Sequence, residues 1–314
     1  IKAFFEPESV AVIGATPIPN KIGNRVIDNL VHGEVGRVDT KIGFKGKIYP
    51  VHPTADQIMG YKAYKTVLDI PGPVDQAIIV VPPKYVEKVV EECGKKDVKS
   101  VVIITAGFAE VGKTKEEQRI VDITHQYNMR IIGPNCLGIY NPHINFNGTF
   151  ADEAPEKGHI AFVSQSGALC ISAILHSNKI GIGYSHFVSI GNKPDVDDAA
   201  LLNYFAHDEK TKCIGLYVES MPNGRSFYEE AKRLTYRVPI VVLKSGRTQY
   251  GANAASSHTG AISTVDSSYD AAFKQAGVYR AKEWFELFDT AQTFSTQLPP
   301  EGCLLYTSDA ADEE

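Results

Sequence analysis

Ser9-Val10-Ala11-Val12-Ile13-Gly14-Ala15-Thr16 is an apolar run that ends in a glycine-containing turn close to the beginning of the chain. The run has the length and the β-branched content of a buried strand. A helical pattern over residues 23–30 follows the turn. This order of strand, turn and helix predicts an α/β domain in which ligands bind at the carboxyl ends of parallel strands.

The same alternation of short β-branched runs with amphipathic stretches continues along the whole chain and predicts two parallel α/β sheets. In the first half, strands are expected at residues 9–13, 47–51, 76–81, 100–105 and 129–132, and helices near 23–30, 85–93 and 115–127. In the second half, strands are expected at 160–163, 184–188, 213–218 and 238–243, and helices near 168–176, 196–205, 227–234 and 265–275.

The order of these elements predicts two domains. A Rossmann-like domain is expected over residues 1–142, a polar linker without periodicity over 143–157, and a second α/β domain over 158–302. The tail 303–314 resembles the translation of a sequencing adapter and is excluded from the fold prediction. Since the chain also begins with Ile1, we expect neither end to be the natural one.

Composition excludes several classes of protein. The 314 residues carry a net charge of -5, which gives no basic surface for a nucleic acid partner. No apolar run approaches the roughly 20 residues of a membrane span, and no signal peptide is recognisable, so we expect a cytoplasmic protein. Cysteine and histidine residues lack metal-ligand spacing, so no metal site is predicted in this chain.

The loops after the first-half strands favour a groove for coenzyme A over a site for NAD. The turn after strand one lacks Gly-x-Gly-x-x-Gly, and strand two ends in His52-Pro53 without the carboxylate that holds an NAD ribose. Val81-Pro82-Pro83 and Thr105-Ala106-Gly107 instead predict an apolar, proline-walled groove with a glycine floor, suited to CoA. For Gly14-Ala15-Thr16, a purely structural turn remains an equal alternative.

The second half carries a candidate phosphoryl-transfer site. His258 lies in a loop of small residues that could present it as a covalent nucleophile. The stretch 164–168 runs from a strand into a helix start, whose amides and dipole favour an anion, although a simple N-cap is the alternative. Glu219, at a strand end, is expected to accept the imidazole N–H; a solvated carboxylate is the alternative.

Seven motifs stand in the order and spacing of one known family. They are Gly14-Ala15-Thr16, Val81-Pro82-Pro83, Gly133-Pro134-Asn135-Cys136-Leu137-Gly138, Ser164-Gln165-Ser166-Gly167-Ala168-Leu169 and Ser257-His258-Thr259-Gly260-Ala261, joined by Thr105-Ala106-Gly107 and Ser189-Ile190-Gly191-Asn192-Lys193. The chain resembles the alpha part of ADP-forming acetate–CoA ligases, within the succinyl-CoA synthetase alpha-subunit superfamily of NDP-forming acyl-CoA synthetases. The resemblance implies an N-terminal Rossmann-like CoA-binding domain followed by a flavodoxin-like succinyl-CoA-synthetase-type domain.

The resemblance also assigns residues to roles. His258 and Glu219 are the expected catalytic residues. The expected phosphate site consists of Ser164, Ser166, Gly167, Ala168 and Gly260. The expected CoA site consists of Gly14, Ala15, Thr16, Val81, Pro82, Pro83, Thr105, Ala106, Gly107, Asn135 and Cys136. Where the succinyl-CoA synthetase branch places a lysine near CoA this chain has Thr54-Ala55, and the candidate replacements are Lys62, Lys45 and Lys21.

The implied activity interconverts acyl-CoA, ADP and phosphate with a small carboxylic acid, acetate by default, ATP and CoA, through an acyl phosphate and a phosphohistidine. ADP or ATP with Mg is expected on an ATP-grasp beta subunit or on fused C-terminal domains, in a hetero- or homo-oligomer. The main alternative is a CoA- or acyl-CoA-sensing regulatory module of an acetyltransferase fusion. A third hypothesis is an NAD-dependent oxidoreductase.

Overall fold

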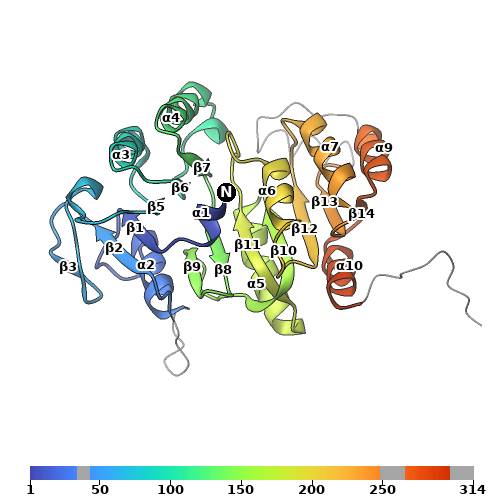
Figure 1. The fold of residues 1–314 in the computed structure, drawn as a ribbon, viewed down its shortest axis with the longest axis horizontal. Helices are drawn as coiled ribbons and strands as arrows, with labels where there is room; N and C mark the ends of the chain where they lie inside the picture. The colour runs from blue at the N-terminus through green and yellow to red at the C-terminus, as the bar shows by residue number, and fades with distance from the viewer. Residues whose placement is uncertain (34–42, 248–265, 298–314) are drawn as a thin grey trace, which may run out of the picture.

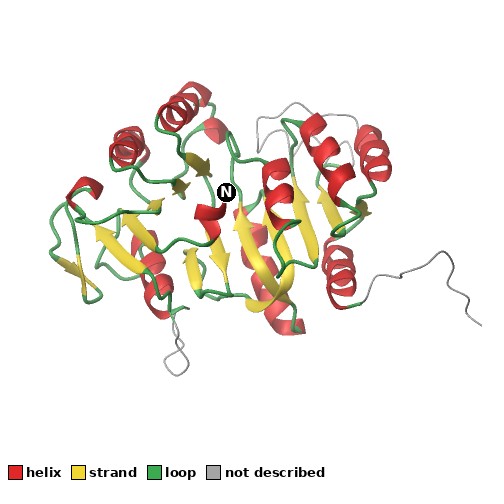
Figure 2. Cartoon of the chain, in the orientation of Figure 1, coloured by secondary structure: helices red, strands yellow, loops and turns green. Residues whose placement is uncertain are grey.

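Two α/β domains lie side by side in the computed structural model, which describes residues 1–33, 43–247 and 266–297 (Figures 1 and 2). Each domain has a central sheet with helices on both faces, as the alternating sequence pattern predicts. The predicted tail at 303–314 lies outside the described residues.

The first sheet has the strand order β2-β1-β5-β6-β7, and all its strands are parallel. Alternate residues of β1 face opposite ways: Val10 and Val12 pack toward α2, and Ala11 and Ile13 pack toward α3 and α4. The strand order changes direction at β1, because β2 lies on one side of it and β5, β6 and β7 lie on the other. The carboxyl ends of β1 and β5 are therefore the expected ligand site. The elements are β1 (Ser9–Ile13), α2 (Ile22–His32), β2 (Lys47–Val51), β5 (Gln76–Ile79), α3 (Pro83–Lys95), β6 (Ser100–Ile103), α4 (Thr114–Gln126) and β7 (Arg130–Ile132).

Short elements that the sequence pattern did not predict complete this domain. They are helix α1 (Lys2–Phe5), the hairpin β3 (Gln57–Ile58) and β4 (Tyr61–Lys62), and the 3-10 turns η1 (Val67–Asp69) and η2 (Ala109–Val111). Each spans four residues or fewer, which is too short for a periodic signal.

The second sheet has the order β14-β13-β12-β10-β11-β8-β9. Its first five strands are parallel. The strand order changes direction at β10, because β11 lies on one side of it and β12, β13 and β14 lie on the other, so the ends of β10 and β12 are the expected ligand site. Helices α6, α7 and α9 cover one face, and α5 and α10 cover the other. The elements are β10 (Glu156–Ser164), α5 (Gly167–Ile180), β11 (Gly183–Ser189), α6 (Asp198–Phe205), β12 (Cys213–Val218), α7 (Gly224–Leu234), β13 (Ile240–Lys244), α9 (Asp266–Ala276), β14 (Tyr279–Ala281) and α10 (Trp284–Thr296).

The segment predicted as a linker, residues 143–157, is not without secondary structure: it contains β9 (Phe146–Thr149) and the first two residues of β10. With β8 (Gly138–Asn141), which begins before the predicted boundary at 142, β9 forms a hairpin that pairs antiparallel with β11. The second sheet is therefore mixed at this edge and not wholly parallel. All four β9 residues are buried, partly against α2 of the first domain, so the strand shows no alternation of apolar and polar residues.

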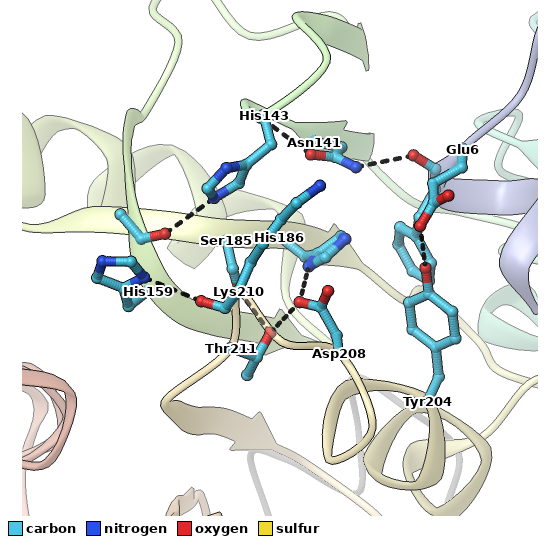
Figure 3. Close-up of polar contacts among 12 residues, drawn as sticks. Glu6, Asn141, His143, His159, Ser185, His186, Tyr204, Asp208, Lys210 and Thr211 are labelled. Carbon is cyan, nitrogen blue, oxygen red and sulfur yellow. Dashed lines mark hydrogen bonds and ion pairs between the residues drawn. The ribbon is translucent and has the colours of Figure 1, made fainter.

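A second area of contact between the domains lies where the end of α1 and Glu6 meet β8, β11 and α6; Figure 3 shows Glu6, Asn141, His186 and Tyr204 of this area. His186 of β11 packs against both Phe5 and Phe205, with ring centroids 5.1 and 5.0 Å away. Asn141 donates a hydrogen bond to the Phe5 carbonyl (2.9 Å), and Tyr204 donates one to Glu6 (3.3 Å). One apolar core runs through both domains at this junction.

Candidate functional site

A cleft of about 990 Å³ opens between the two domains at the carboxyl ends of their strands. Its walls come from the segments after β5, β6 and β7 and from the start of α5. This is the edge of each sheet at which parallel α/β folds bind ligands. The lining residues are Ile22, Val80, Val81, Pro82, Ile104, Thr105, Ala106, Glu110, Asn135, Cys136, Leu137, Phe150, Gln165, Ser166, Gly167, Ala168 and Ile171.

Nine of the residues predicted for the CoA and phosphate sites line this one cleft. They are Val81, Pro82, Thr105, Ala106, Asn135, Cys136, Ser166, Gly167 and Ala168. Seven other predicted residues do not line it: Gly14, Ala15, Thr16, Pro83, Gly107, Ser164 and Glu219. His258 and Gly260 lie outside the described residues.

The turn after β1 has a packing role. The Ala15 side chain is fully buried in the apolar core, so only the backbone of this residue is left to meet a ligand. A Cβ on Gly23 would lie 2.1 Å from the Gly14 carbonyl oxygen, so a glycine at this position lets α2 pack on the turn. Gly14 itself has φ +96°, in the region that favours glycine. The close packing fits the structural alternative, and the ligand contact of this turn stays a prediction.

The loops after β5 and β6 brace each other behind the cleft wall. Thr105 Oγ1 donates a hydrogen bond to the Val81 carbonyl (2.7 Å). Gly107 has φ +111°, and a Cβ there would lie 3.0 Å from Cγ of Pro83, the first residue of α3. Pro83 and Gly107 therefore fix the wall that Val81 and Thr105 present to the cleft.

Cys136 lines the cleft with a thiol that burial keeps protonated. The residue is 5% exposed, and its Sγ donates to the Ile103 carbonyl (3.3 Å). Burial raises the pKa of the Cys136 thiol to about 12. Because the thiolate is the reactive form, this cysteine contributes shape and apolar surface.

The start of α5 offers backbone amides to the cleft. Ser166 is the N-cap, with its hydroxyl accepting from the Leu169 amide (3.4 Å), and the first helical bond runs from Cys170 to the Ser166 carbonyl (3.0 Å). The amides of Gly167 and Ala168 precede that bond, so they have no acceptor within the helix. Their position and the helix dipole favour an anion at this point.

Gln165 connects this helix start with the end of β12, the neighbour of β10 at the point where the strand order changes direction. Its Oε1 accepts from the amides of Glu219 (2.9 Å) and Ser220 (3.0 Å), and its Nε2 donates to Ser220 Oγ (3.0 Å). The predicted phosphate-binding segment and the predicted carboxylate Glu219 are thus brought together through Gln165.

Among the described residues that line the cleft, the charged one is Glu110. Burial alone would raise the pKa of Glu110, but hydrogen bonds from Asn192 and from the Gly107 and Phe108 amides outweigh it and hold that pKa below its usual value. Burial raises the pKa of the neighbouring Glu117, and the charge of Glu110 adds to the rise. Asn192 of the second domain donates to both carboxylates, at 2.6 and 2.7 Å.

Of the three lysines considered as CoA contacts, one is excluded. Lys45 lies in a separate groove with Ser9, at the amino end of β1 and far from the carboxyl ends that form the cleft. Lys62 lies on β4 over the Tyr64 ring, at 5.3 Å. Lys21 is the N-cap of α2, directly before the cleft residue Ile22, and is the one placed beside the cleft.

Sequence reasoning gave no role to Gln165, Asn192 or Glu110. Gln165 and Asn192 belong to motifs that were recognised, so their position after a strand was a usable signal. No local signal in the sequence marked Glu110, because its partner Asn192 is 82 residues away in the chain.

Two family models match most of the chain. Residues 8–142 match a CoA binding domain, and residues 157–294 match a succinyl-CoA ligase like flavodoxin domain. The two matches coincide with the two sheets, except that β8 and β9 lie at or between their boundaries.

Several curated and solved proteins are similar over nearly the whole chain. The ADP-forming acetate–CoA ligase of Methanocaldococcus jannaschii is 48% identical over 95% of this chain and 40% of its own length. Subunit alpha of ADP-forming acetate–CoA ligase II from Pyrococcus furiosus is 46% identical over 94% of this chain and 63% of its own. The solved dinucleotide-forming acetyl-coenzyme A synthetase 1 of Ca. Korarchaeum cryptofilum, in complex with phosphate and ADP, is 42% identical with a TM-score of 0.90, covering 96% of this chain and 63% of that one. The chain thus spans less than two thirds of each of these relatives.

Proposed function

The chain belongs to the superfamily of NDP-forming acyl-CoA synthetases and succinyl-CoA synthetase alpha subunits, and from this we propose that it is the CoA-binding, phosphoryl-carrying part of an ADP-forming acyl-CoA synthetase. The observation that carries the proposal is the interdomain cleft. It joins the Val81-Pro82 and Thr105-Ala106 walls of one domain to the anion-favouring start of α5 in the other.

The cleft residues fit a CoA thioester whose reactive end lies against α5. Val80, Val81 and Pro82 form an apolar wall suited to a thin chain, and the exposed Ala106 leaves room beside it. The amides of Gly167 and Ala168 suit phosphate at the reacting end. Both halves of the reaction would then share one cleft.

The proposed sequence exchanges one activated bond for another. Phosphate attacks the acyl carbonyl of the thioester, the carbon–sulfur bond breaks, and the CoA thiol and an acyl phosphate result. A nitrogen of His258 then attacks the phosphorus of the acyl phosphate, and the carboxylate leaves. ADP, held by an ATP-grasp beta subunit or by further domains of the same protein, accepts the phosphoryl group from His258, with Mg on that part.

In this scheme the second domain supplies both the groups that bind the phosphoryl oxygens and the carboxylate that orients His258. The amides of Gly167 and Ala168 stabilise the negative charge that develops on the phosphoryl oxygens. Glu219 accepts the N–H of the other imidazole nitrogen, which fixes the tautomer of His258 and stabilises its positive charge. Support for Glu219 is its place at the end of β12, held by Gln165 beside the start of α5.

The proposed substrate is a small carboxylic acid, with acetate first, because the ligases of Methanocaldococcus jannaschii and Pyrococcus furiosus are named for it. A similar protein of Nitrosopumilus maritimus, 43% identical, is named for 4-hydroxybutyrate. All three of these relatives are ligases, so the regulatory alternative gains no support from them.

Phosphorylation by acetyl phosphate tests the proposal. The purified chain is incubated with acetyl phosphate, and intact mass and peptide mapping locate an acid-labile phosphoryl group. We expect one group on His258 and none in His258→Ala. The control is His207→Ala, at an exposed histidine after α6, which should label like the wild type. Equal labelling of His258→Ala would refute the nucleophile assignment.

A further inference from the structure

Three consecutive residues between β11 and α6, Gly191 to Lys193, form a close contact between the domains beside the cleft. Gly191 has φ +66°, and a Cβ there would lie 2.2 Å from the Pro134 carbonyl oxygen. The Asn192 amide donates to that same oxygen (3.0 Å). The turn therefore lies directly against the segment that leads from the first domain into the cleft residues 135–137.

The Asn192 side chain points into the first domain. Its Nδ2 donates to Glu110 Oε2 (2.6 Å) and Glu117 Oε2 (2.7 Å), and its Oδ1 accepts from Asn135 Nδ2 (3.3 Å). Glu110 in turn accepts from the amides of Gly107 and Phe108. One amide group thus links the loop after β6, which includes the cleft residue Ala106, to the second domain.

The Lys193 side chain points the opposite way. It is fully buried, and its Nζ donates to the Ser220 carbonyl (2.5 Å) and to Asp198 Oδ2 (2.5 Å). Lys193 is also a non-glycine residue with φ +50°, a conformation that persists only where the surroundings enforce it. A buried ammonium is stable only when paired, which Asp198 provides, and the same ammonium holds the Ser220 peptide through its carbonyl.

Ser220 is held at all of its polar groups. Lys193 binds its carbonyl, and Gln165 binds its amide, its hydroxyl and the amide of Glu219. Since Gln165 also lines the cleft, the peptide that carries Glu219 has a fixed position relative to the start of α5.

We propose that Asn192 and Lys193 are positioning residues for two different half-sites: Asn192 sets the CoA-binding wall through Glu110, and Lys193 sets Glu219 through Ser220. This inference rests on the proposed function. Neither side chain acts on a reacting atom: Asn192 holds Glu110 and the loop after β6, and Lys193 holds the peptide that carries Glu219. Two adjacent residues with opposed side chains would then fix the distance between the thioester-binding and phosphoryl-transfer parts of the cleft.

Two variants separate the roles. Asn192→Asp is nearly isosteric but removes the donor and places a third carboxylate beside Glu110 and Glu117. Asn203→Asp is the matched control, because Asn203 also donates to a carboxylate, Glu230 (3.1 Å), but on the exposed side of α6. Asn192→Ala, which adds no charge, serves if Asn192→Asp does not fold.

For Lys193, the double variant Lys193→Gln/Asp198→Asn removes both buried charges together and leaves neither unpaired. The shorter glutamine withdraws the charged donor from the Ser220 carbonyl. Hydrogen exchange of the Glu219 and Ser220 amides reports the position of that peptide without any reaction, and thermal unfolding checks that the variants fold.

The readouts are CoA affinity by calorimetry and the rate of labelling of His258 by acetyl phosphate. We expect Asn192→Asp to weaken CoA binding by about tenfold or more, as loss of a charge-assisted hydrogen bond predicts. We expect the Lys193→Gln/Asp198→Asn variant to slow labelling by about tenfold or more and to speed exchange at Glu219 and Ser220. Asn192→Asp should change CoA affinity severalfold more than the labelling rate, and the double variant should change the labelling rate severalfold more than CoA affinity.

Wild-type affinity in Asn192→Asp, wild-type labelling in the double variant, or equal loss of both readouts in both would overturn the inference. A wild-type chain that neither binds CoA nor takes up label is a different outcome, because it would refute the proposed function itself.

Discussion

Replacing His186 with phenylalanine should remove a large part of the acid sensitivity of the fold. His186 is 1% exposed, and neither ring nitrogen has a hydrogen-bond partner among the described residues. Burial lowers its pKa from the ordinary 6.5 to about 4. The carboxylate of Asp208, 3.5 Å from Nδ1, pulls that pKa upward, but burial outweighs it. The nearby His143 and Lys210 lower it further.

The sign and size of the effect follow from proton linkage. Below pH 6.5 the unfolded chain binds a proton at this histidine that the folded chain refuses until about pH 4. Stability therefore falls as the pH drops through this window, by about 2 kcal/mol at about pH 5 and about 3 kcal/mol at about pH 4. Above pH 6.5 the histidine is neutral in both states and contributes no pH dependence.

Urea unfolding followed by the fluorescence of Trp284, the single tryptophan, measures this. His186→Phe keeps an aromatic ring among Phe5, Tyr204 and Phe205 and removes two buried polar atoms, so it should be at least as stable as wild type near neutral pH.

At about pH 5 the variant should have lost about 2 kcal/mol less than the wild type. The exposed His159→Gln variant is the control and should follow the wild type. Parallel losses in wild type and His186→Phe would refute the reasoning. A wild type that gains stability in acid relative to the variant would mean that the Asp208 attraction dominates.

Other predictions concern strain, the cleft and the thiols. Gly191→Ala should destabilise the fold by roughly 3 kcal/mol or more in urea unfolding, because the new Cβ would clash with the Pro134 oxygen and the left-handed φ disfavours alanine. Gly181→Ala, which has φ +74° but open space around the new Cβ, should cost only about 1 kcal/mol. Ala106→Trp should fill the cleft and weaken CoA binding by roughly tenfold or more in calorimetry while the exposed Ala271→Trp does not; equal affinity would place CoA elsewhere. Four buried thiols should resist iodoacetamide near neutral pH until urea unfolds the chain, because burial raises their pKa, and peptide mapping that finds one alkylated in the folded chain would contradict this. These are Cys93, Cys136, Cys170 and Cys213.

Periodicity predicted the central strands well because each is short, β-branched and buried on both faces, as in β1, whose five residues are all buried. It failed for the β8–β9 hairpin. The sequence of β9 is Phe146-Asn147-Gly148-Thr149, in which asparagine and glycine are typical of turns. Tertiary contacts override that preference: Asn147 donates to the Gly33 carbonyl, and Phe146 packs on Phe44.

The candidate site was predictable where it depends on strand ends. Carboxyl ends of parallel strands share one edge, so Val81, Thr105 and Ser166 could be expected near one another before any coordinates. Side-chain pairs between distant loops could not. Nothing local marks Glu110 as the partner of Asn192, or Lys193 as a fully buried cation bound to the Ser220 carbonyl.

The most direct test of the central claim starts from the thioester. The chain is incubated with acetyl-CoA and radiolabelled phosphate, and free thiol, acetate and protein-bound label are measured together. The proposed function predicts one CoA thiol and one acetate released for each acid-labile phosphoryl group on His258, and no label without acetyl-CoA or in His258→Ala. Acetyl-CoA that binds but transfers no phosphoryl group to His258 would contradict it.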